Sequence, residues 1–384
     1  MSVSVSIDAF VARQLTRLNA MLGPDQQLQS LAELVDLPVT RKDELLKAQL
    51  AAPPFGGNRP RKLSHIFQSP GPIYEPGLDT DDFWRMGRFL NEIGMAAQDI
   101  ALNTFSYHFT PAGAMFESAA KALGAVVVPT GPGNTRQQAE VIHATRATAY
   151  IGTPDFLQII LDRGAEDGFD LSSIKFAAVS AGPLFPSQRQ AYEDRGILCR
   201  QCYGTADVGM IAYETATCTN GMVIDDDVIV EIVSPGTGVP VPYGEIGEVV
   251  VTVLNPDYPI IRFAVGDLSA FATDSDPSGE GRPRIVGWRG RADQAAKVKG
   301  MFIRPEQVSR LVEECEGVAR ARVEISRDGA SELIEVKLEC TSGTAQDFAA
   351  TVQEILKLRS KVTTVEVGAL PRDGVLVEDL RETP

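Results

Sequence analysis

Short apolar runs alternate with amphipathic stretches through the middle of the chain. A run that is apolar throughout is typical of a strand buried on both faces, whereas apolar residues at helical spacing predict a helix with one buried face. The expected strands cover residues 99–106, 125–130, 147–153, 174–182 and 197–204, and the helices between them cover 111–124, 135–146, 154–164 and 186–196. This order predicts an α/β fold with a largely parallel sheet flanked by helices. Ligands of such sheets bind at the carboxyl ends of the strands.

The regions on either side of this alternation follow other patterns. Residues 1–60 read as helices and loops. A helix is predicted from Thr80 onward, because helical spacing puts four apolar residues on one face: Phe83, Met86, Leu90 and Ile93. Between residues 228 and 254, apolar and polar residues alternate between Gly/Pro turns, which predicts antiparallel strands. The stretch 273–284 is polar and rich in turn residues, so we expect a loop there.

The C-terminal part of the chain predicts a separate unit. Pro305 can open a helix, and Asp328 with Gly329 marks a hairpin between two alternating runs. A second helix over residues 345–361 and a strand over 363–370 complete the pattern. We therefore expect a large domain over residues 1–289 and a small α+β domain over residues 290–384.

Composition narrows the class of protein. The 384 residues are 44% hydrophobic and carry a formal net charge of −15, which argues against non-specific binding of nucleic acid or of anionic membranes. No apolar stretch is long enough to cross a membrane, and the N-terminus lacks the layout of a signal peptide. Five cysteines favour a reduced, cytoplasmic location. Cys199 and Cys202 have redox or metal spacing, but their surroundings read as a buried strand.

Three glycine-containing turns follow predicted strands. They cover residues 180–183, 203–207 and 266–268. Small residues after parallel strands let a ligand approach the backbone, although each turn alone is more typical of an ordinary loop. Asp207 could bind a metal ion, and Asp267 could bind a pair of ribose hydroxyls.

Taken in order, longer stretches closely resemble the phenylacetate–coenzyme A ligase family of adenylate-forming enzymes. They are "QCYGTADVGMIA" from Gln201, "YPIIRFAVGDLSAF" from Tyr258 and "GRADQAAKVKGMFIRPEQV" from Gly290. The stretch "ALGAVVVPTGPGNTRQQAEVI" from Ala122 is similar to a further segment of that family. The resemblance runs from about residue 30 to the C-terminus.

The resemblance implies the adenylate-forming ligase fold. A large nucleotide- and acid-binding domain, with a small antiparallel barrel-like part, would be followed by a small mobile domain. The carboxylate of an acid would attack the α-phosphate of ATP to give an acyl-adenylate, and coenzyme A would then displace AMP. ATP or AMP, Mg²⁺ and coenzyme A are the implied cofactors. The small domain would swing about a hinge at Asp293.

The resemblance also implies roles for single residues. Positions at the nucleotide would be Ser69, Gly71, Ala181, Gly182, Pro183, Tyr203, Gly204, Asp267 and Arg291. Catalytic positions would be Thr205, Asp207, Lys297, Lys299 and Arg372, with Asp207 also the magnesium ligand. An aromatic acid would bind at Phe105, Tyr107, His108 and Phe109, which read equally well as core packing with one satisfied histidine.

Two stretches depart from the family pattern at the phosphates. The family has a loop close to S-S-G-T-T-G-K-P where this chain has Ser69–Pro76, so two prolines remove N–H donors and Glu75 puts a negative charge where a lysine is expected. Val375 stands where the family has a lysine that reaches the α-phosphate, and Arg372 is the nearest cation. Asp207 replaces a glutamate and keeps its charge. These changes predict a weakened phosphate half beside an intact adenosine half.

Three hypotheses follow from this combination. The protein could be a working ligase of an aromatic acid, with Arg59, Arg61 or Lys62 as substitute cations. It could be a partial enzyme that uses a preformed acyl-adenylate, or a non-catalytic scaffold that binds a nucleotide or an acid. The acyl acceptor could be coenzyme A or the thiol of a carrier protein. A small carboxylic acid is the expected partner, with no nucleic acid and no membrane, and a homodimer is left open.

Overall fold

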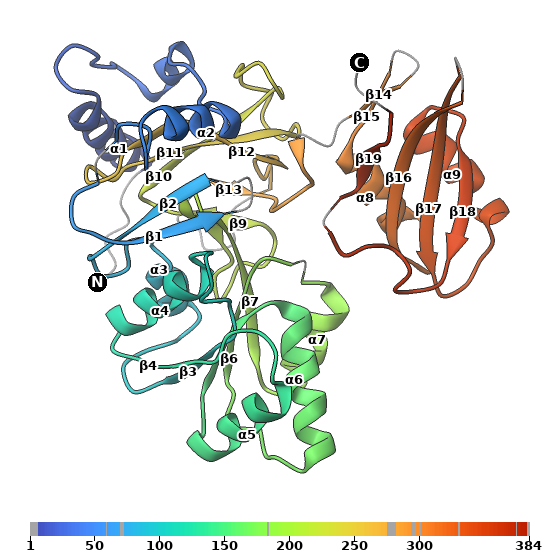
Figure 1. The fold of residues 1–384 in the computed structure, drawn as a ribbon, viewed down its shortest axis with the longest axis horizontal. Helices are drawn as coiled ribbons and strands as arrows, with labels where there is room; N and C mark the ends of the chain where they lie inside the picture. Colours follow the sequence, from blue (N-terminus) through green and yellow to red (C-terminus); the bar gives the residue numbers. More distant parts are fainter. Residues whose placement is uncertain are drawn as a thin grey trace.

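The structure is a computed structural model, shown in Figure 1. It describes residues 7–58, 60–69, 73–182, 184–274, 282–292, 296–298, 301–328, 331–373 and 375–381. In these residues, no helix combines the length and the apolar character that crossing a bilayer requires.

An eight-stranded sheet forms the centre of the large part of the molecule, with the strand order β13-β9-β8-β7-β6-β5-β3-β4. Neighbouring strands from β4 to β7 run parallel, and β8, β9 and β13 extend the sheet antiparallel. The strands are β3 (Ile100–Asn103), β4 (Val126–Pro129), β5 (Ala149–Gly152), β6 (Phe176–Val179), β7 (Leu198–Thr205), β8 (Gly209–Tyr213), β9 (Met222–Ile224) and β13 (Arg284–Ile285). The five strands predicted from the apolar runs are confirmed.

Helices cover both faces of this sheet (Figure 1). They are α3 (Gly87–Glu92), α4 (Ala112–Ala122), α5 (Thr135–Thr145), α6 (Pro154–Asp167) and α7 (Pro186–Glu193). Successive strand residues point to opposite faces. Ala101 and Ile151 therefore join the core beneath α3 and α4, whereas Leu102 and Tyr150 join the core beneath α5, α6 and α7. Burial on both faces explains why these strands are apolar throughout.

A three-stranded antiparallel sheet, as the alternating pattern predicts, lies against the N-terminal helices. It consists of β10 (Val228–Val233), β11 (Gly247–Val253) and β12 (Ile260–Ser269). The N-terminal elements are α1 (Ile7–Leu22), η1 (Leu31–Asp36) and α2 (Lys42–Ala51). The hairpin of β1 (Leu63–Ser69) and β2 (Ile73–Leu78) packs against α2, where the Gln49 side chain binds both the N–H and the C=O of Tyr74 at 2.9 and 2.8 Å.

The helix predicted from Thr80 is wrong at its start. The structure begins α3 only at Gly87, because Asp82 and Arg85 have positive φ angles of 49° and 65°, which a right-handed helix does not allow. Similarly, the helix predicted over 345–361 ends at Leu356, where Lys357 takes a φ of 56°.

The C-terminal elements form their own four-stranded sheet, of order β18-β17-β16-β19, with two helices (Figure 1, orange to red). They are β14 (Ala296–Val298), β15 (Met301–Ile303), α8 (Pro305–Glu314), β16 (Val318–Asp328), β17 (Ser331–Cys340), α9 (Ala345–Leu356), β18 (Lys361–Val365) and β19 (Val377–Asp379). One hydrophobic cluster unites them, and all its members lie between residues 296 and 377. The domain boundary at residue 290 stays a prediction.

Candidate active site

The carboxylate of Asp267 joins three separate parts of the chain. Its Oδ2 accepts a hydrogen bond from the Tyr203 hydroxyl at 2.8 Å, and its Oδ1 accepts from Trp288 Nε1 at 3.1 Å and from Arg291 at 3.2 Å. Asp267 lies on β12 and Tyr203 on β7, so the antiparallel and the parallel sheets meet at this carboxylate. Burial, followed by the Asp267 charge, raises the pKa of Tyr203 well above its ordinary value, which keeps its hydroxyl a donor.

Backbone pairing holds the third part of the chain in place. The N–H of Leu268 donates to the carbonyl of Gly290, and the N–H of Arg289 donates to the carbonyl of Leu268, both at 2.8 Å. Gly290 has a φ of 124°, and a Cβ there would meet Pro305 Cβ at 2.3 Å, so only glycine fits. This pairing presents both Trp288 and Arg291 to Asp267. Sequence reasoning missed Trp288, because nothing in its local pattern distinguishes it.

The turn between β7 and β8 carries Asp207. Gly204 permits a tight turn, since a Cβ at this position would meet the Gly209 carbonyl oxygen at 2.7 Å. Asp207 is buried, and its Oδ2 lies 2.9 Å from Lys42 Nζ at the start of α2. The sequence did not predict a role for Lys42, which precedes the candidate substitute cations Arg59, Arg61 and Lys62 in the chain. Of those, Arg61 and Lys62 are exposed, and Arg59 lies outside the described residues.

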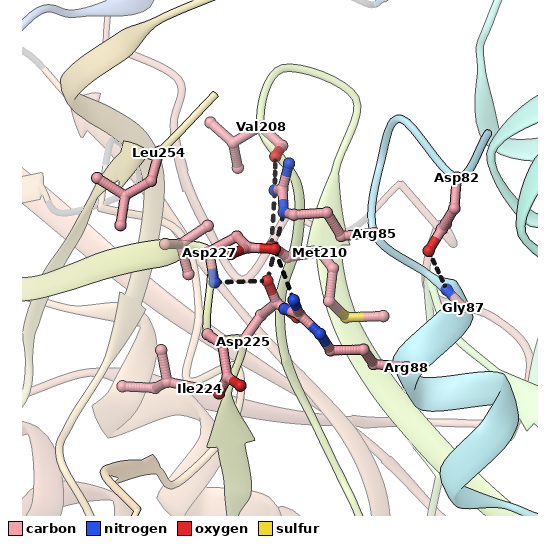
Figure 2. Close-up of polar contacts among 12 residues, drawn as sticks. Asp82, Arg85, Gly87, Arg88, Val208, Met210, Ile224, Asp225, Asp227 and Leu254 are labelled. Atoms are coloured by element: carbon pink, nitrogen blue, oxygen red, sulfur yellow. Dashed lines mark hydrogen bonds and ion pairs between the residues drawn. The ribbon is translucent and has the colours of Figure 1, made fainter. Parts of the chain in front are cut away.

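The largely buried side chain of Arg85 holds the same turn in place. Figure 2 shows the Arg85 guanidinium donating to the carbonyl oxygens of Val208 and Met210, at 2.5 and 3.1 Å. Its Nε lies 3.4 Å from the fully buried carboxylate of Asp225, which also binds Arg88 at 3.0 Å. Val208 and Met210, which closely follow Asp207, are thus tied to an ion-pair network, which limits how far the turn can move.

Glu75 points into the protein beside Asp207. It is 2% exposed, and the Ser69 hydroxyl donates to its Oε1 at 2.7 Å. Burial, followed by the charge of Asp207, raises the pKa of Glu75 to about 9. Burial and the neighbouring carboxylate thus act against the negative charge predicted for Glu75. Asp207 Oδ1 is a buried oxygen without a hydrogen-bond partner in the described residues.

Glu75 and Asp207 share the wall of one cavity. The cavity has a volume of about 210 Å³ and is otherwise mainly apolar, lined among others by Thr40, Leu45, Phe55, Tyr258, Ile260 and Phe263. Helix α2 forms one side of this cavity and β12 the other. The phosphate end, the part of the predicted site that would hold the phosphates, is thus lined by the carboxyl groups of Glu75 and Asp207. Lys42 lies next to Asp207.

The predicted magnesium ligand is already engaged by a cation. The Lys42 ammonium lies 2.9 Å from Asp207 Oδ2. Across the described part of the chain, no group of three His, Cys, Asp or Glu side chains could hold a metal ion.

The predicted acid-binding stretch is divided between core and surface. Phe105 is buried and stacks on Phe116 with ring centroids 5.1 Å apart, and the Tyr107 hydroxyl accepts from Asn103 at 2.9 Å. His108 is exposed, and Phe109 is 76% exposed. The Phe109 carbonyl accepts the Gln68 N–H at 2.8 Å, which places this stretch beside β1. Its role in acid binding stays a prediction.

The other predicted site residues are placed as follows. Ala181 and Gly182 follow β6, and Thr205 ends β7, where its hydroxyl accepts the Val208 N–H at 3.4 Å. Lys297 lies on β14, and Arg372 is exposed near the end of the chain. Four predicted residues lie outside the described ones: Gly71, Pro183, Asp293 and Lys299.

Comparison with known proteins agrees with this arrangement. The model of the AMP-binding enzyme family matches residues 81–253. The phenylacetate–coenzyme A ligase of Aromatoleum evansii is 30% identical over 335 residues, which cover 82% of this chain and 74% of that protein. The phenylacetate–coenzyme A ligase of Escherichia coli K12 is 25% identical over 307 residues, 75% of this chain and 70% of that protein. The chain belongs to the phenylacetate–coenzyme A ligase family.

A solved structure extends the likeness to the fold. The 2-hydroxyisobutyryl-CoA ligase in its postadenylation state superposes with a TM-score of 0.75 at 22% identity, over 96% of this chain and 85% of that one. The predicted adenylate-forming ligase fold is therefore confirmed. The matching family model describes an AMP-binding enzyme and the curated relatives are named coenzyme A ligases, so the enzyme class predicted from the motifs is confirmed as well.

The raised pKa of Glu75 gives a first prediction. Folding takes up a proton at Glu75 between pH 4.5, its ordinary pKa, and about pH 9, so this group makes the free energy of unfolding fall as pH rises through that window. Glu75→Gln keeps the shape without titrating. We expect this variant to gain stability over the wild type by at most about 1.4 kcal/mol per pH unit between pH 5 and 8, in urea unfolding curves.

Glu140→Gln, at an exposed position of α5, is the matched control and should follow the wild type at every pH. A difference between Glu75→Gln and wild type that stays constant from pH 5 to pH 8 would contradict the raised pKa of Glu75.

A second prediction concerns Arg85. Arg85→Met removes a guanidinium that is 12% exposed from two carbonyls and a buried carboxylate, and should lower the free energy of unfolding by about 3–5 kcal/mol. Arg88→Met removes a side chain that is 41% exposed and should cost about 1 kcal/mol. Urea unfolding curves of both variants measure the two changes in the free energy of unfolding. An Arg85→Met effect no larger than that of Arg88→Met would show that this buried network does not fix the turn.

Proposed function

We propose that the protein joins an aromatic carboxylic acid to the thiol of coenzyme A by way of an acyl-adenylate. The observation that supports this function most is the carboxylate of Asp267, held by Tyr203, Trp288 and Arg291 where the two sheets meet. The name shared by the four curated relatives, phenylacetate–coenzyme A ligase, supports both an aromatic acid and coenzyme A as substrates.

In this proposal Asp267 accepts hydrogen bonds from the ribose hydroxyls, and Arg291 orients its carboxylate. Tyr203 lies against the adenine, and Thr205 donates to the α-phosphate. The thiolate of coenzyme A then attacks the acyl carbon, so that a C–S bond forms and the C–O bond to the phosphate breaks. AMP leaves with the electron pair of that bond, and the proton of the thiol goes to solvent. Arg372 and Lys297, on the small unit, stay candidates for the phosphate and the thiol.

The acyl-adenylate can be made on the protein from ATP or can be supplied to it. The arrangement of Ser69, Glu75 and Asp207 favours the second route, because the hydroxyl and the carboxyl groups of the phosphate end bind one another. The Val375 backbone carbonyl lies 3.3 Å from Arg322, in the place where the family pattern has a lysine. A carrier-protein thiol as acceptor, a homodimer and a cytoplasmic location stay predictions.

A two-armed assay tests the function. In one arm, the protein receives ATP, coenzyme A and a panel of aromatic acids, with and without Mg²⁺. In the other, it receives synthetic phenylacetyl-adenylate and coenzyme A. We expect the thioester, measured by liquid chromatography, in at least the second arm, and a fall of about 10²–10³ in kcat/KM for Asp267→Asn, which weakens the nucleotide contact.

Asp162→Asn, on the exposed side of α6, is the control and should leave the rate unchanged. Absence of thioester in both arms, with every acid and with the adenylate, would overturn the proposed function.

A further inference from the structure

Two pairs of side chains lie where the family pattern puts the β- and γ-phosphates of ATP. Ser69 and Glu75 come from the two strands of the hairpin, Asp207 from the β7–β8 turn and Lys42 from α2. The Ser69 hydroxyl lies 2.7 Å from Glu75 Oε1, and the Lys42 ammonium lies 2.9 Å from Asp207 Oδ2. Ser69 is the only serine or threonine in the altered loop.

A phosphate-binding loop works by aiming hydroxyl and N–H donors at an anion. The Ser69 hydroxyl has a single proton, and its hydrogen bond to Glu75 uses that donor. The Lys42 charge is likewise balanced by Asp207. Ser69, Glu75 and Asp207 are exposed by 5%, 2% and 8%, so three members of this group are covered by protein and do not face solvent.

Helix α2 holds this arrangement from one side. Gln49 lies two helical turns after Lys42 and binds the backbone of Tyr74 through both its amide atoms. Because Tyr74 directly precedes Glu75 on β2, the same helix fixes the strand that carries Glu75 and supplies the cation for Asp207. The positions of the four side chains are therefore fixed by the fold.

We infer that the protein selects its nucleotide by the adenosine and the first phosphate alone. The β- and γ-phosphates of ATP, and a divalent cation, add no affinity, so the site takes AMP or an acyl ester of AMP at least as well as ATP. This inference rests on the proposed function, because it assumes that adenosine binds at Asp267. It implies that an ATP-dependent adenylation of the acid supplies the substrate, and that this protein carries out the thiol transfer.

Titration calorimetry with AMP, ADP and ATP, each with Mg²⁺ and with EDTA, tests the inference on the wild-type protein. We expect the three dissociation constants to agree within about threefold and to be unchanged by Mg²⁺. ATP with Mg²⁺ binding tenfold or more tightly than AMP would overturn the inference and leave the proposed function standing. If AMP and phenylacetyl-adenylate both failed to bind, the inference and the proposed function would fall together.

Two variants probe the side chains themselves. Lys42→Met leaves Asp207 without its ammonium, and Glu75→Ala releases the Ser69 hydroxyl. In both variants we expect ATP with Mg²⁺ to gain tenfold or more in affinity relative to AMP, because a carboxylate or a hydroxyl becomes available. Lys47→Met, which removes an exposed lysine from the same helix, should keep the wild-type ratio. An ATP-to-AMP ratio that is unchanged in both test variants would overturn the assignment of these residues.

Discussion

The structure of the site depends on one buried carboxylate, that of Asp267. It binds a hydroxyl from the parallel sheet, and an indole and a guanidinium from the segment that leads to the small unit, while it belongs itself to the antiparallel sheet. Burying a carboxylate costs free energy unless donors surround it. If the sheets and the segment separated, Asp267 would therefore be exposed or would lose its hydrogen-bond donors. The residues predicted for adenosine binding are therefore held by the same contacts that hold the fold together.

Much of the fold could be predicted from the sequence, because its central strands are buried on both faces and leave continuous apolar runs. The helix expected from Thr80 failed for a local reason. Apolar spacing indicates which side chains are buried, but it does not indicate that Asp82 and Arg85 take positive φ angles. Similarly, the C-terminal helix ends where Lys357 turns left-handed, although the apolar spacing continues.

The site could be predicted only where its residues belong to recognisable motifs. Tyr203, Asp267 and Arg291 lie in such motifs, and the structure brings them together. Lys42 and Trp288 do not, because their importance comes from long-range contacts, to Asp207 and to Asp267, that no local pattern reveals. The raised pKa of Glu75 could not be predicted from the sequence either, since it depends on burial and on a neighbouring carboxylate.

The two halves of the site differ in how their polar groups are satisfied. Asp267 is surrounded by donors, so a ligand hydroxyl that binds there competes with internal partners of similar kind. At the phosphate end the Ser69 hydroxyl binds Glu75, and the Lys42 ammonium binds Asp207. A triphosphate would have to break these contacts and would meet two carboxyl groups, whereas a single phosphate bound nearer to Thr205 leaves them intact. These internal contacts are the physical reason why we infer that the site distinguishes a monophosphate from a triphosphate.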